Sequence, residues 1–69
     1  MFKPKSLDEL NAALMTKAEV EVTVDGKNHR GFVVSTGPAN SLLKEVRIEL
    51  KENGVKKSFI LKGMRVGIQ

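Results

Sequence analysis

Residues 58–69 read S-F-I-L-K-G-M-R-V-G-I-Q, and this stretch decides how the chain is closed. Its apolar run, Phe59 to Leu61, stops at Lys62-Gly63 and resumes at alternate positions: Met64, Val66 and Ile68. Such alternation predicts a strand with one buried face, and the glycine before it predicts a sharp bend. We therefore expect two short strands that meet at a tight corner. The second of them has an edge that must be covered or paired.

The segment that precedes the strands predicts one short helix. Ser6-Leu-Asp-Glu9 is a capping box, in which the serine hydroxyl accepts a backbone hydrogen bond at the helix start. Leucines follow at helical spacing: Leu7, Leu10 and Leu14. We expect a helix over residues 6–17 that docks on the sheet by this apolar stripe, after a mobile leader at residues 1–5.

Alternating apolar residues and two turn signals predict the other strands. Residues 19–24 and 45–51 alternate apolar with polar side chains, and Asp25-Gly26 and Asn53-Gly54 are type I′ hairpin signals. Gly31 permits a strong bend ahead of Phe32-Val33-Val34, whose consecutive apolar side chains predict at least partial cover on both faces. The turn-rich residues 37–41 should end that strand, near Thr36.

Together these elements predict one domain over residues 1–69. Five short strands are too few for a two-sheet sandwich, and a small curled barrel fits them better. We expect an all-β small barrel in which an N-terminal helix precedes a strongly bent, five-stranded antiparallel sheet over residues 18–69.

The residue inventory argues against catalysis and metal binding. The chain has no cysteine, and its one histidine, His29, stands among basic residues where we expect an exposed strand residue. No residues have the spacing of a nucleophile with its base or of metal ligands. We expect a protein that is not an enzyme and has no cofactor, metal or small-molecule substrate.

The sequence gives few signs of export or of membrane insertion. No apolar run approaches the length of a membrane span, and the N-terminus lacks the apolar core of a signal peptide. The lack of cysteine fits a reducing compartment. We expect a soluble cytoplasmic protein that does not bind membranes.

The net charge of +4 is concentrated near the end of the chain. Residues 53–69 contain no acid and four basic residues: Lys56, Lys57, Lys62 and Arg65. Another basic group follows the first turn: Lys27, His29 and Arg30. Such surfaces attract the phosphates of nucleic acid, and the alternative is a solubilising charge on solvated strands. Aromatic platforms for bases are scarce, because Phe32 and Phe59 stand in runs typical of a core.

The order of elements resembles the Sm-like family, which includes Hfq, over essentially the whole chain. I-L-K-G-M-R-V at residues 60–66 resembles the family's second motif, an aliphatic residue followed by Arg-Gly and a short apolar strand. Lys62 stands at the arginine position, and Gly63 matches. In the first motif, Gly31 matches the glycine of the bent second strand, and Val33 matches the apolar position after it.

The loop that binds RNA in the Sm-like family differs here. Gly37 stands where the family has aspartate, and Ser41 where it has asparagine, with Asn40 one position early. The resemblance implies a homo-oligomeric ring that binds single-stranded RNA, with the terminal strand, Met64–Ile68, paired to the fourth strand of a neighbouring copy. It places the RNA against Asn40, Ser41, Lys62, Gly63 and Arg65. A secondary basic surface is expected at Lys27, His29, Arg30, Lys56 and Lys57.

A second resemblance stays open. Small barrels of the Src-homology-3-like type, including short phage-encoded ones with a leading helix, share the hairpin order and the length of this chain. They have no obligatory ring. On this resemblance the protein is an interaction module, such as a phage accessory protein, that binds a protein partner or duplex DNA.

Overall fold

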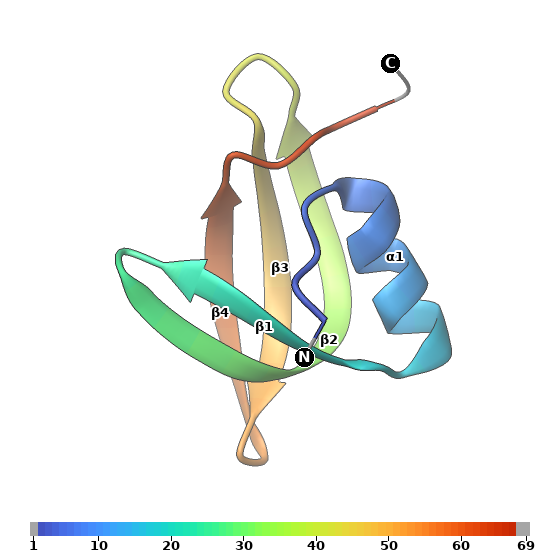
Figure 1. Ribbon diagram of the computed structural model, residues 1–69, viewed down its shortest axis with the longest axis vertical. Coiled ribbons are helices and arrows are strands. Elements are labelled where there is room, and N and C mark those ends of the chain that lie inside the picture. Colours follow the sequence, from blue (N-terminus) through green and yellow to red (C-terminus); the bar gives the residue numbers. More distant parts are fainter. Residues whose placement is uncertain (1, 68–69) are drawn as a thin grey trace.

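The computed structural model describes residues 2–67 and contains one helix and four strands. The elements in chain order are α1 (Leu7–Thr16), β1 (Glu19–Val24), β2 (Lys27–Asn40), β3 (Glu45–Glu52) and β4 (Val55–Lys62). The strands form one antiparallel sheet in the order β1-β2-β3-β4, and α1 lies beside β2 (Figure 1). No helix in the described part of the chain is long and apolar enough to cross a membrane.

Helix α1 begins and ends where the sequence predicts. The Ser6 hydroxyl accepts a hydrogen bond from the backbone N–H of Glu9 at 3.1 Å, as the capping box requires. Lys17 ends the helix in the left-handed region, with a φ of 55°. The apolar face of the helix joins the core through these residues: Leu7, Leu10, Ala13 and Leu14.

Both predicted hairpin turns have the type I′ conformation. Asp25 and Gly26 have φ angles of 51° and 79°, and Asn53 and Gly54 have φ angles of 52° and 80°. Positive φ at both central residues matches the right-handed twist of the flanking strands. Pairing therefore starts at the residues that flank each turn, and the turns set the register of both hairpins.

Strand β2 pairs with two neighbours, β1 and β3. Its first part pairs with β1 and the remainder with β3, and Phe32 pairs with a residue of each. Gly31 stands at this change of partner, where a Cβ atom would clash with the carbonyl oxygen of Lys51. The glycine is required because the two backbones approach so closely.

The structure has four strands where the sequence predicts five. The predicted fifth, Met64–Ile68, is not a strand in the described part of the chain, and Ile68 lies outside the described residues. Arg65 instead forms a parallel bridge with Ser6, between the leader and α1: the N–H of Leu7 donates to the carbonyl of Arg65 at 2.8 Å, and the N–H of Arg65 donates to that of Lys5 at 3.0 Å. The sheet is open, with β1 and β4 at its edges, and these two strands contact each other.

Contacts tie the segment expected to be a mobile leader to the sheet. Phe2 forms a parallel bridge with Val20, and its carbonyl accepts the N–H of Glu21 at 2.9 Å. Pro4 is buried. The leader thus covers part of the outer edge of β1, which would otherwise present unpaired backbone groups.

Strand β2 runs past its predicted end at Thr36 and stops at Asn40. Pro38 has no N–H to donate, and it stands within a register shift that keeps the strand paired on either side. The turn comes later, where the Asn40 side-chain oxygen accepts the N–H groups of Leu42 and Leu43, both at 3.0 Å. Gly37 and Pro38 predicted a turn, but in the structure they form a bulge within β2.

The core lies between α1 and the inner face of the sheet. The alternation predicted for β1 and β3 is confirmed, and the buried apolar residues are Leu10, Ala13, Val20, Val22, Val33, Val46, Ile48, Leu50, Leu61 and Met64. Both faces of β2 are at least partly covered, as predicted, but Phe32, which stands in a run typical of a core, is 47% exposed, and Val34 is 39% exposed. Only Val33 between them faces the core.

Candidate nucleic-acid interface

Two predicted site residues lie in one cross-strand row at the end of the sheet. Asn40 of β2 pairs with Glu45 of β3, and Glu45 pairs with Lys62 of β4. Directly opposite residues on neighbouring strands project to the same face. Ser41 follows Asn40 and Gly63 follows Lys62, so the register gathers four predicted residues from two distant segments. We call Asn40, Glu45 and Lys62 the Lys62 row.

Only the oxygen of the Asn40 side chain takes part in hydrogen bonds within the fold of residues 2–67. Its oxygen holds the turn that follows β2, whereas its Nδ2 group has no hydrogen bond to any described residue. An amide nitrogen of this kind donates two hydrogen bonds. Asn40 can therefore offer donors to a ligand without giving up the turn.

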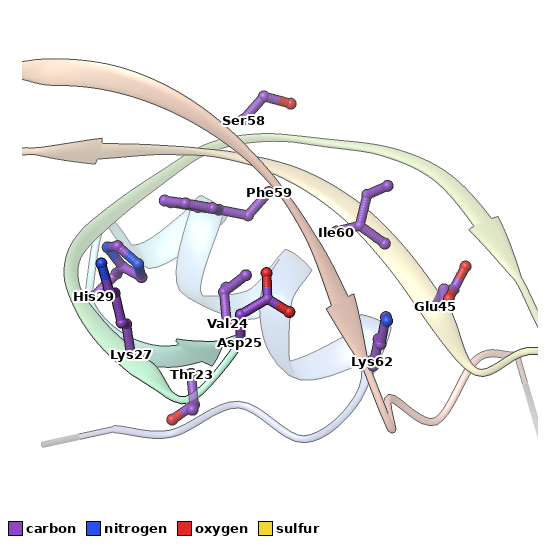
Figure 2. Close-up of a pocket in the computed structure, with 10 residues that line it drawn as sticks. All are labelled: Thr23, Val24, Asp25, Lys27, His29, Glu45, Ser58, Phe59, Ile60 and Lys62. Atoms are coloured by element: carbon purple, nitrogen blue, oxygen red, sulfur yellow. The ribbon is translucent and has the colours of Figure 1, made fainter.

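Lys62 lines two hollows on the surface. The larger has a volume of about 870 Å³ and lies between the β1–β2 hairpin and β4 (Figure 2). The smaller, of about 240 Å³, lies between the leader and the end of β4. Its lysines are Lys3, Lys5 and Lys62, against the single carboxylate of Glu21. An excess of cations over acids favours an anionic ligand in the smaller hollow.

The larger hollow has balanced charge and one aromatic wall. Its ionisable residues besides His29 are two lysines and two acids: Lys27, Lys62, Asp25 and Glu45. The rings of His29 and Phe59 lie against each other on one side of it, with centroids 4.5 Å apart (Figure 2). This hollow offers a flat ring surface together with donors and acceptors.

Glu52 contacts two members of the predicted basic surface. Its Oε1 lies 3.1 Å from His29 Nδ1 and 3.2 Å from Lys57 Nζ. The His29 side chain is only 18% exposed, so the expectation of an exposed strand residue is wrong. Hydrogen bonds from His29, and then from Lys57, lower the pKa of the Glu52 carboxyl, because both favour its ionised form.

We expect a titration followed by NMR to place the pKa of Glu52 below its usual value of 4.5. A carboxylate whose pKa is lowered by folding adds stability above its unfolded pKa, and this stability is lost as the pH falls through the folded value. In His29→Ala the pKa of Glu52 should rise toward 4.5, because the largest cause is gone. Lys3→Ala, which removes a separate ion pair with Glu21, should leave it unchanged. A Glu52 pKa that His29→Ala does not raise would contradict this account of the cluster.

The remaining predicted residues lie on the surface without acidic partners. Of the twelve lysine and arginine residues, only Lys3 and Lys57 form ion pairs within residues 2–67. The side chains of the others in the predicted set are exposed: Lys27, Arg30, Lys56, Lys62 and Arg65. The structure does not bring these residues into one cluster; it distributes them over the sheet's surface.

Sequence reasoning did not include Lys51 among the basic site residues. This lysine pairs with Lys56 across the β3–β4 hairpin. The Asn53-Gly54 turn signal contains this information, because a two-residue turn fixes which residues face each other on the strands beside it.

The site has no metal-binding character in the part of the chain that the structure describes, where no group of His, Asp or Glu residues could hold an ion. Comparison of the chain with protein-family models, with curated proteins and with solved structures gave no match.

Proposed function

We propose that the protein is a non-catalytic, Sm-like small barrel that binds single-stranded RNA. The observation that carries the proposal is the placement of Lys62, which lines both hollows and shares a row with Asn40. A lysine in this position binds phosphate, and the free amide group of Asn40 donates to base edges. Ser41, Gly63 and Arg65 adjoin the row along the chain.

The arrangement of the strands supports the barrel. Strand β2 pairs with β1 and with β3 on either side of the close approach at Gly31, and the edge strands β1 and β4 contact each other. A sheet whose two edges meet is curled toward closure, as in small barrels.

Titration of a labelled single-stranded RNA at low salt, with duplex DNA as competitor, tests this function. We expect the RNA to bind and the duplex to compete weakly, because unpaired bases can enter the hollows beside Lys62 and paired bases cannot. Equal competition by the duplex would contradict the proposal and favour the second candidate below.

We further propose that copies assemble into a ring through the outer edge of β4 and the terminal segment, residues 64–68. In the described part of the chain no strand pairs with that edge of β4, and an unpaired edge favours pairing with another chain. Light scattering across a dilution series should give a constant mass several times 7.6 kDa. A mass of 7.6 kDa would overturn the ring and leave the RNA titration as a separate test.

An interaction module of the Src-homology-3-like type is the second candidate function. It is favoured by Leu42 and Leu43, which are 93% and 62% exposed on the turn between β2 and β3. Adjacent leucines held out by an ordered turn suit contact with a partner protein. Absence of RNA binding at low salt would favour this candidate over the first.

A further inference from the structure

The outer face of the sheet carries a second feature, far from the Lys62 row along β3. Phe32 of β2 pairs with Lys51 of β3, and Lys51 pairs with Lys56 of β4. Opposite residues project to the same face, so one aromatic ring and two lysines form a continuous row, which we call the Phe32 row. All three side chains are exposed.

The two lysines of the Phe32 row face each other without compensation. Like charges directly opposite on neighbouring strands destabilise the pair, and neither lysine has an acidic partner within residues 2–67. Glu52, the next residue along β3, is already bonded to His29 and Lys57. An anion bound between the two ammonium groups would remove their repulsion.

Phe32 adds a stacking surface beside these cations. It is 47% exposed, whereas the next residue of the strand, Val33, is buried. Arg30 lies two positions earlier on the same face, is exposed, and has no ion pair in the described part of the chain. A ring for bases next to cations for phosphates is the combination that binds single-stranded nucleic acid. A protein partner that used the ring would need a carboxylate placed between the two lysines to compensate them.

The Phe32 row and the Lys62 row lie on one face of β3. The residues of β3 that face outward alternate along the strand: Glu45, Arg47, Glu49 and Lys51. At roughly 3.4 Å per residue, Glu45 and Lys51 are about 20 Å apart, a span that several nucleotides of an extended single strand can cover. Arg47, exposed between the two rows, adds a cation to the path.

We propose that the Phe32 row is a second contact for the same RNA strand. A base stacks on Phe32, Lys51 and Lys56 bind the adjacent phosphates, and the strand runs along β3 to the Lys62 row. The inference rests on the proposed function, and it assigns to that function a surface that the Sm-like resemblance does not supply.

Lys51→Glu tests the Phe32 row, because stability and binding should move in opposite directions. The substitution turns a repulsive cross-strand pair into an attractive one, so the melting temperature should rise. Affinity for a single-stranded RNA of about twelve nucleotides should fall about tenfold near physiological salt, because one phosphate contact is lost and a negative charge is added. Lys17→Glu, the same charge change at the end of α1, should leave the affinity within about twofold.

Phe32→Ala tests the stacking contact in the same titration. Loss of one base–aromatic stack should weaken binding about tenfold, and Phe32→Tyr should retain it. If Lys51→Glu and Phe32→Ala bind RNA as the wild type does while Lys62→Glu does not, the Phe32 row is refuted and the proposed function stands. If the wild-type protein binds no RNA, both fail.

Discussion

Gly31→Ala is expected to lower the free energy of unfolding by roughly 3 kcal/mol or more, a large part of the stability of a domain of this size. The added methyl group would clash with the backbone carbonyl of Lys51. Neither the carbonyl nor the Gly31 backbone can move without breaking the pairing between β2 and β3. Urea unfolding followed by circular dichroism gives the measurement.

Gly37→Ala is the matched control for Gly31→Ala. Both glycines lie in β2, but a Cβ at residue 37 would lie 3.5 Å from its nearest neighbour, the carbonyl oxygen of Arg47, which is an ordinary contact. Neither residue has a positive φ, so the two variants differ in steric contact and not in backbone preference. Equal stability of the two variants would contradict the close approach of β2 and β3 at Gly31.

Lys62→Glu is expected to weaken RNA binding by at least about a hundredfold, because it reverses the charge that both hollows share. It also places two carboxylates opposite each other, at residue 62 and at Glu45, which should cost only about 0.2–1 kcal/mol on an exposed strand pair. The fold should therefore persist. Fluorescence anisotropy with labelled RNA measures the affinity, and a thermal melt verifies the fold.

Lys62→Arg provides the matching conservative variant. Arginine keeps the positive charge and adds a planar fork of donors suited to phosphate, and the Sm-like family has arginine at the position that Lys62 resembles. Binding by Lys62→Arg should equal or exceed that of the wild type. Loss of binding in both variants would indicate damage to the end of the sheet, and unchanged binding in Lys62→Glu would remove Lys62 from the site.

The parts of the fold that local sequence signals determine were predictable. The capping box at Ser6 fixed the start of α1, and the Asp-Gly and Asn-Gly turns fixed two hairpins and their registers. In each case the residues that carry the signal also make the structure, through a hydroxyl that caps a helix or a backbone that tolerates positive φ.

The parts that depend on distant neighbours were not predictable from the sequence. Alternation in residues 64–68 indicated a strand, but it contains no information about which segment would pair with Arg65, and the leader does so. The apolar run at Phe32 likewise indicated burial, although Phe32 is 47% exposed in the structure. The pairing of Asn40 with Glu45 depends on two register shifts in β2, which no local pattern shows.

The sequence could predict those parts of the candidate site that depend on the register of a tight hairpin. The Asn53-Gly54 turn already places Lys51 opposite Lys56, so the repulsive pair could have been found from the sequence. The proximity of Asn40 and Lys62 could not, because it is set by the bulged end of β2. Whether Phe32 is a core residue or a stacking surface is likewise settled only by its exposure.

The measurement that tests RNA binding most directly is the affinity of the wild-type protein for single-stranded RNA across a salt series. Contacts of Lys51, Lys56 and Lys62 with phosphates predict that the logarithm of the association constant falls with the logarithm of salt concentration with a slope of about −2, since each single-strand phosphate contributes about −0.7. An affinity that is measurable at low salt and declines with this slope would support the account. No binding at the lowest salt concentration would contradict it.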